Sequence, residues 1–144
     1  MTPNVVVFMT DHQRADTIYP RSRAITPHVE ALAKSGTVFS SAYCPAPHCC
    51  PSRASFYTGL FPSEHGVWNN VNVGNTLAST FYEGTEIFVK RLRESGYTSY
   101  FSGKWHVSNE MSPLDCGFDV CAPKYHFAKK SGYLRPDPCE WDYY

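Results

Sequence analysis

The stretch TEIFVKRLRESGYTSYFSGKWH, residues 85–106, decides the fold class of this chain. Ile87, Phe88 and Leu92 form one apolar face in residues 85–94 and charged side chains form the other, which predicts an amphipathic helix that ends at Gly96. Residues 97–102 then have the composition of a strand. A helix that leads directly into a strand is half of a βαβ unit, so the stretch predicts an α/β fold.

The preceding part of the chain shows the same alternation. The β-branched run at 4–10 predicts a strand buried on both faces, and Thr26-Pro27 predicts a helix start with an apolar face and a stop at Gly36. A short strand at 37–39, a helix from Pro51 to Gly59 and a loop over 61–80 follow.

We therefore expect a mostly parallel central sheet with helices on both faces. Strands 4–10 and 97–102 should be central, buried and mutually parallel, with helices 27–35 and 85–95 packed on the sheet. The chain of 144 residues is long enough for one domain, and residues 119–144 form a weakly assigned tail without clear periodicity.

Composition excludes several classes of function. Lys plus Arg and Asp plus Glu both number 13, so the net charge of zero gives no sign of a nucleic-acid partner or of an anionic membrane surface. The apolar runs are shorter than the roughly 18 residues of a membrane span. The start has no basic segment before its apolar run, so we expect a cytoplasmic protein, or a periplasmic or secreted one if a leader has been removed.

The six cysteines do not indicate a structural metal, and a disulfide framework is possible only for an exported protein, since the chain is too large and apolar to depend on one. No Cys-x-x-Cys pair occurs, so a zinc motif is excluded, and the adjacent Cys49 and Cys50 are poorly placed for a set of disulfides. A single cysteine is most often a small buried apolar residue. A reactive role therefore needs further support from neighbouring residues.

Clusters of polar residues follow two of the predicted strands and lie at the start of one predicted helix. They are Asp11-His12 after the first strand, Cys49 to Arg53 at a helix N-terminus, and Lys104 with His106 after strand 97–102. Open α/β sheets place their sites at the carboxyl ends of the strands. A helix N-terminus and nearby cations favour an anion and lower the pKa of a cysteine, which suggests a thiolate nucleophile, and Asp11 can bind a metal.

The segment 49–59, CCPSRASFYTG, resembles the signature of the type I sulfatases, the formylglycine-dependent branch of the alkaline phosphatase superfamily. The segment from Pro3 to Asp11 is similar to the first strand and metal loop of that family, and residues 26–33 resemble its Thr-Pro helix. Residues 62–67 and 103–106 match as well, in the same order, and the resemblance extends to about Phe118.

This resemblance implies roles for particular residues. Cys49 would be oxidised to formylglycine, whose hydrate offers one hydroxyl to attack sulfur and a second to expel sulfate. Arg53 would orient the hydrate and balance its charge. Lys104 and His106 would be catalytic residues that contact the sulfate oxygens or the nucleophile.

The resemblance also implies a divalent metal, held by Asp11, by residue 12 and by Cys49. The family usually has a carboxylate or amide at the second of these positions, and here it is His12. Calcium is the metal that the resemblance implies, whereas an imidazole suits Mn²⁺ or Zn²⁺ better. Either His12 is not a ligand, or the metal is not calcium.

The implied substrate is a small-molecule or carbohydrate sulfate ester, and the implied partner is a formylglycine-generating or equivalent modifying enzyme. The resemblance implies a protein of several hundred residues, so we expect this chain to be the N-terminal part of the catalytic domain, inactive without the downstream metal ligands. Two alternatives stay open: a phosphonate or phosphate monoester hydrolase of the same superfamily, and an inactive sulfatase-like remnant.

Overall fold

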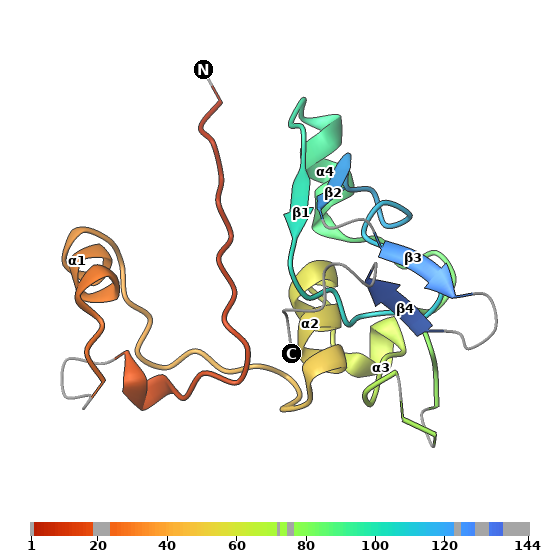
Figure 1. The fold of residues 1–144 in the computed structure, drawn as a ribbon, viewed down its shortest axis with the longest axis horizontal. Coiled ribbons are helices and arrows are strands. Elements are labelled where there is room, and N and C mark those ends of the chain that lie inside the picture. Colours follow the sequence, from red (N-terminus) through yellow and green to blue (C-terminus); the bar gives the residue numbers. More distant parts are fainter. Residues whose placement is uncertain are drawn as a thin grey trace. The chain divides into compact units, whose positions relative to one another are not determined.

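The computed structural model describes residues 2–18, 24–71, 73–74, 77–122, 125–128 and 133–136. The chain divides into two compact units, Met1–Ala42 and Tyr43–Tyr144, and Figure 1 shows the elements of each. The helices in the described ranges are all too short or too polar to cross a membrane.

The first unit contains a 3₁₀ turn, η1 (Ala15–Thr17), and one helix, α1 (Pro27–Ser35). The prediction of helix 27–35 is confirmed, with Thr26 at the N-cap position and Gly36 at its end. The expectation that this helix packs on a sheet is wrong for the described residues, because α1 buries no residue and Leu32 is 70% exposed.

The predicted strands at 4–10 and 37–39 are not present as strands. Both segments are irregular, and Val6 and Phe8 are each 88% exposed. An extended segment becomes a strand only through hydrogen bonds to a neighbour, and the described residues of this unit supply no such neighbour. The expectation that 4–10 is a central, buried strand was therefore wrong for this structure.

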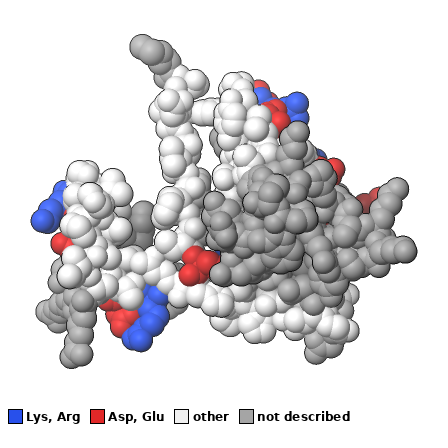
Figure 2. Space-filling model, in the orientation of Figure 1, with Lys and Arg blue, Asp and Glu red and all other residues white. Residues whose placement is uncertain are grey.

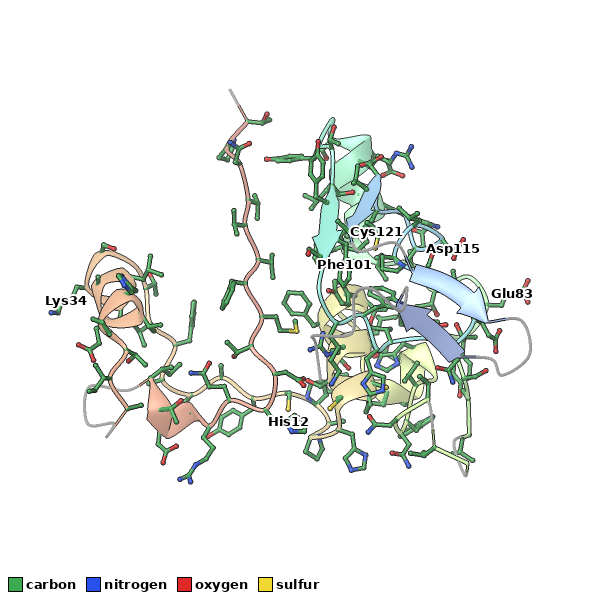
Figure 3. The ribbon with its side chains drawn as sticks, viewed as in Figure 1. His12, Lys34, Glu83, Phe101, Asp115 and Cys121 are labelled. Atoms are coloured by element: carbon green, nitrogen blue, oxygen red, sulfur yellow. The ribbon has the colours of Figure 1, made fainter. Side chains whose placement is uncertain are left out.

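The second unit contains the helices α2 (Cys49–Thr58), α3 (Pro62–His65) and α4 (Phe88–Glu94). Strand β1 (Tyr100–Ser102) pairs in parallel with β2 (Val120–Ala122), with Phe101 opposite Cys121. Both of these residues are buried, and Figure 3 labels them. Strands β3 (Tyr125–Ala128) and β4 (Tyr133–Pro136) form a separate antiparallel pair.

The parallel partner of β1 is thus β2, from the region where the sequence pattern fades, and not segment 4–10. Asp119 explains the pairing, since its carboxylate accepts hydrogen bonds from the backbone N–H and the hydroxyl of Ser99, at 2.8 and 3.0 Å. These bonds hold the start of β2 beside the start of β1 and lower the pKa of Asp119, with Arg93 adding to the effect at 3.3 Å. A three-residue strand fixed in this way has no periodic signal to detect.

The other boundaries in this unit differ slightly from expectation. Helix α4 begins at Phe88 instead of residue 85, and α3 lies inside the predicted loop at 61–80. Ile87 is buried as expected, but the fully buried residue of α4 is Val89. The helix ends at Glu94 with Ser95 as its C-cap, and Gly96 follows with a φ of 84°.

An aromatic cluster forms the centre of the second unit. Trp105 is 1% exposed, and its ring centroid lies 5.0 Å from that of Tyr57 on α2 and 5.6 Å from that of Phe101 on β1. Phe118 packs edge-on against Trp105 and Phe101. Because each buried aromatic side chain removes about 150–250 Å² from water, this cluster is a large share of what holds α2 against β1.

Charged residues are mixed on the surface. Lys90 pairs with Glu86 at 3.1 Å and Arg14 pairs with Asp16 at 2.6 Å. Figure 2 shows acidic and basic atoms close together on the face in view. This agrees with the balanced composition, and anion recognition must come from a local group of residues.

Candidate active site

Cys49 is the first residue of α2, and local sequence explains why the helix begins there. Pro45 and Pro47 break regular structure before it, and Pro51 fits the first turn, where its missing N–H is not needed. The helix ends at Gly59, which has the left-handed φ of 72° that favours glycine. The sequence therefore places Cys49 where backbone N–H groups and the helix dipole favour negative charge.

The two adjacent cysteines have different environments. Cys50 is completely buried, and burial raises the pKa of its thiol to about 11 although the N–H of Val71 donates to its sulfur at 3.4 Å. At neutral pH this thiol is protonated and shielded, so it is a poor nucleophile and a poor substrate for oxidation. Cys49 is only partly buried. The difference in burial favours Cys49 as the reactive member of the pair.

Arg53 connects α2 to the loop that follows β1. The arginine is 7% exposed, and its Nη1 donates a 2.6 Å hydrogen bond to the backbone carbonyl oxygen of Lys104. A planar guanidinium has several donors in fixed directions, so it can hold a carbonyl and still present other N–H groups. The structure thus joins two of the predicted site segments, residues 49–53 and 103–106.

The loop at 103–106 is shaped by its backbone and anchored by Trp105. Gly103 has a φ of 101°, and His106 has a φ of 45°, a conformation that only a small fraction of non-glycine residues adopt. Trp105 is buried between Lys104 and His106, which are both partly exposed, and its Nε1 donates to the carbonyl oxygen of Met111 at 2.9 Å. The buried indole therefore fixes the backbone from which these two side chains project.

His65 has a structural environment. It is completely buried, its Nδ1 accepts a hydrogen bond from the N–H of Val67 at 3.1 Å, and its Nε2 lies 2.9 Å from Oγ of Ser55 on α2. Since Nδ1 accepts, Nε2 carries the proton and donates to Ser55. Burial lowers the pKa of His65, so the imidazole is neutral at pH 7. His65 is therefore a structural hydrogen-bonding residue that connects α2 to the segment after α3.

The predicted metal-binding residues Asp11 and His12 belong to the first unit, and both are exposed. His12 has a φ of 54°, so residue 12 occupies a conformation uncommon for non-glycine residues. The other predicted site residues belong to the second unit. From the sequence we expect Asp11, Cys49, Arg53, Lys104 and His106 to converge on one pocket, and this stays a prediction.

Sequence reasoning missed Asn70, whose side-chain oxygen accepts a hydrogen bond from the backbone N–H of Cys50 at 3.0 Å. A signal for it was present. The residue before α2 is His48, which makes no side-chain cap, although Ser, Thr, Asp or Asn is preferred there. A helix start without a local cap predicts an acceptor from elsewhere in the chain.

Comparison with known proteins identifies the family. The profile of the Sulfatase family matches residues 3–130. The chain belongs to the sulfatase family. This membership agrees with the resemblance seen in segment 49–59 and implies an α/β fold like that of alkaline phosphatase, of which the β1–β2 pair and its helices are a small part.

Sulfatases from distant organisms align with most of the chain. An N-acetylglucosamine-6-sulfatase of Homo sapiens is 37% identical over 118 residues, which are 80% of this chain and 21% of that protein. An N-acetylglucosamine-6-O-sulfatase of Bacteroides thetaiotaomicron is 33% identical over 94% of the chain and 23% of its own length. An N-acetylgalactosamine-6-sulfatase of Canis lupus familiaris is 29% identical over 94% of the chain and 28% of its own length. The chain therefore spans between a fifth and three tenths of these relatives.

Proposed function

We propose that the intact protein hydrolyses sulfate esters, with residue 49 acting as a formylglycine nucleophile beside a divalent metal. The observation that carries this proposal is the contrast at the start of α2, in a chain of the sulfatase family: Cys49 is only partly buried, whereas its neighbour Cys50 is completely buried with a raised pKa. Oxidation of a cysteine by a modifying enzyme needs an accessible thiol. Of the two cysteines, Cys49 is the more exposed.

The chemistry needs two separate oxygen functions at one residue. As the hydrate of formylglycine, residue 49 supplies a hydroxyl that forms a bond to sulfur as the ester oxygen leaves with a proton, and a second hydroxyl whose deprotonation expels sulfate and restores the aldehyde. The chain's own residues supply the electrostatics. The N-terminus of α2, Arg53 and Lys104 would favour the negative charge of the sulfate group, and His106, from the same loop as Lys104, would contact the sulfate oxygens or the nucleophile.

The donor set at Asp11 and His12 fits a divalent metal. A carboxylate is a ligand for Ca²⁺, Mg²⁺ and Mn²⁺, while an imidazole favours Mn²⁺ or Zn²⁺. We propose that these two residues and residue 49 contribute to the metal site of the intact protein. The bound metal would withdraw charge from the reacting group and lower the pKa of a bound hydroxyl.

The relatives suggest a substrate class. Those described above are named as 6-sulfatases of N-acetylated amino sugars. We propose a carbohydrate sulfate ester as the substrate, with 6-sulfated N-acetylglucosamine and N-acetylgalactosamine as the first compounds to test. A formylglycine-generating or equivalent enzyme is the partner that the proposal requires.

Two measurements test the proposal. The mass of the tryptic peptide that spans residues 35–53, from protein made with a competent modifying enzyme, should show that one cysteine has become an aldehyde, and fragmentation should place it at residue 49. The modified protein should then release sulfate from an aryl sulfate or from a 6-sulfated amino sugar. An unmodified Cys49 in fully active protein would refute the formylglycine mechanism.

The departure at His12 favours a second candidate, hydrolysis of phosphonate or phosphate monoesters by the same superfamily. Both substrates are tetrahedral oxyanions, so the cationic residues of the site would suit either. Turnover of an aryl sulfate and of the matching aryl phosphonate should therefore be compared on the same preparation. We expect the aryl sulfate to have the higher kcat/KM, and the opposite order would establish the alternative.

A further inference from the structure

A segment about twenty residues further along the chain supplies the hydrogen-bond acceptor that the N-terminus of α2 lacks locally. His48 occupies the N-cap position without a side-chain cap, and Pro51 has no N–H to donate. The first intrahelical bond runs from the N–H of Ser52 to the carbonyl oxygen of His48 at 3.1 Å. The N–H of Cys50, which an N-cap side chain would ordinarily bind, donates instead to Oδ1 of Asn70 at 3.0 Å.

This hydrogen bond acts on the peptide group that joins Cys49 to Cys50. Because a peptide unit is planar, fixing the N–H of Cys50 also fixes the carbonyl of Cys49 and restricts the backbone angles of residue 49. The direction in which the side chain of residue 49 leaves the backbone is therefore set partly by Asn70. Cys50 is completely buried, so water cannot replace the side-chain oxygen without opening the structure.

Asn70 is itself held by its neighbours. Its own N–H donates to Oδ1 of Asn69 at 2.8 Å, and that oxygen lies 2.9 Å from Nδ1 of His48. On the other side, the N–H of Val71 donates to the sulfur of Cys50 at 3.4 Å. Both ends of the segment 69–71 therefore contact the residues that flank Cys49.

A further bond connects this segment to the rest of the unit. Nδ2 of Asn109 donates to the carbonyl oxygen of Val71 at 2.5 Å, and the backbone N–H of Asn109 donates to the carbonyl oxygen of Ser79 at 2.8 Å. Asn109 lies three residues after His106 on the chain. The segment beyond the Lys104–His106 loop thus supports the residues that hold the start of α2.

We propose that Asn70 is a positioning residue for the nucleophile: it orients the Cys49–Cys50 peptide, and through it the reacting group at residue 49. The catalytic part of this inference rests on the proposed function. The hydrogen bond of Asn70 to the start of α2 does not depend on the proposed function, and its effect can be measured separately. Nucleophile misplacement of about 1 Å can cost roughly 100-fold in rate, so a weak constraint at this point has a large effect on turnover.

The test compares Asn70→Leu with two controls in the intact protein. Leucine has a similar volume and lacks the acceptor, whereas Asn70→Asp keeps an oxygen at the same place. Thr58→Val controls for a general loss of helix stability. The Thr58 hydroxyl, at the opposite end of α2, donates to the carbonyl oxygen of Ala54 at 2.7 Å and accepts from the N–H of Leu60 at 3.1 Å. This substitution therefore removes hydrogen bonds from the same helix, at the end that is far from Cys49.

The first readout is hydrogen exchange at the Cys50 amide together with alkylation of the Cys50 thiol in unmodified protein. Asn70→Leu should raise both rates about tenfold or more, while Asn70→Asp and Thr58→Val stay close to wild type. Equal exchange at Cys50 in Asn70→Leu and in wild type would overturn the assignment, whatever the activity.

The second readout is steady-state kinetics of the modified enzyme. Asn70→Leu should lower kcat roughly 10- to 100-fold with little change in KM, since it disturbs the nucleophile and not the cationic residues that bind the substrate. An equal fall in Thr58→Val would show a general effect of helix stability and overturn the positioning role. Wild-type protein that hydrolyses no sulfate ester, yet keeps the exchange contrast, would refute the proposed function and support the role of Asn70 at the helix start.

Discussion

Nη1 of Arg53 lies 2.6 Å from the backbone carbonyl oxygen of Lys104, and this hydrogen bond connects the helix that begins at Cys49 to the loop that carries Lys104 and His106. The two segments are separated by about fifty residues in the sequence. A change in the position of one is therefore transmitted to the other through this buried guanidinium, in addition to the packing of Tyr57 against Trp105.

Replacing Arg53 should affect stability and activity together. Arg53→Met keeps most of the apolar stem but leaves the Lys104 carbonyl without this donor, and we expect a loss of about 1–3 kcal/mol in the free energy of unfolding. Activity should fall by roughly 100-fold or more, because a cation and the position of the loop are lost together. Urea unfolding and aryl sulfate turnover measure the two effects.

Arg53→Lys is the matched control, since it keeps the charge without the planar arrangement of donors. It should recover only part of the activity. If Arg53→Lys equals wild type in both stability and kcat, the role of the hydrogen bond to Lys104 is contradicted, and charge alone explains the residue.

The adjacent cysteines should respond differently to substitution. Cys49→Ala should abolish sulfate-ester hydrolysis without a large loss of stability, because residue 49 is only partly buried and alanine cannot supply the two hydroxyl functions. Cys50→Ala should leave most of the activity and destabilise the protein by about 1–2 kcal/mol through the cavity that it creates. Sulfate release and thermal unfolding of both variants test this pair of outcomes.

Alkylation gives an independent check on the same two residues. In unmodified protein at pH 8, the Cys50 thiol is protonated because its pKa is raised to about 11, and it is also shielded. Iodoacetamide should therefore label Cys49 much faster than Cys50. Labelling of Cys50 at the faster rate would contradict the structural contrast on which the proposal rests.

The pH dependence of stability should reflect His65. Burial holds its pKa below the ordinary value of 6.5, so the unfolded chain binds a proton more readily than the folded one as the pH falls through that value. Stability from this group is therefore fully present above pH 6.5 and is lost below it, with a slope of at most about 1.4 kcal/mol per pH unit until the folded pKa is reached. Urea unfolding between pH 7.5 and pH 5 measures the slope.

A His65→Gln variant separates this contribution from that of the acidic groups. Glutamine can donate to Ser55 but does not titrate, so the difference in unfolding free energy between wild type and variant should shrink as the pH falls. A difference independent of pH would mean that His65 keeps an ordinary pKa in the folded protein.

Much of the second unit was predictable from local signals, and the reasons are physical. Helix α2 begins near Pro51 and ends at Gly59 because these residues restrict the backbone by themselves, and the amphipathic run places α4 within three residues of its start. The motif around Cys49 and the loop at 103–106 were found from residue types at fixed spacing. The structure then showed that Arg53 joins them.

The parts that could not be predicted depend on distant partners. A run such as 4–10 has the composition of a strand, yet it becomes one only beside a neighbour, and among the described residues it has none. Strand β2 is defined by the Asp119–Ser99 hydrogen bonds and not by periodicity. The uncapped helix start at His48 predicts that some distant acceptor binds the N–H groups of α2, but it does not identify Asn70, because an asparagine twenty residues away carries no local signal of its partner.

The last prediction concerns His12 and the choice of metal. If His12 is a ligand, its imidazole disfavours Ca²⁺ relative to Mn²⁺ or Zn²⁺, because calcium prefers oxygen donors. Intact protein stripped with a chelator should then bind Mn²⁺ or Zn²⁺ more tightly than Ca²⁺, and His12→Asp should reverse the order by supplying a second carboxylate. Calorimetric titration of each metal into both proteins measures this, with Asp11→Ala as the control that should weaken all of them. If His12→Asp leaves the order of affinities unchanged, His12 is not a ligand, and the calcium expected from the family remains the better assignment.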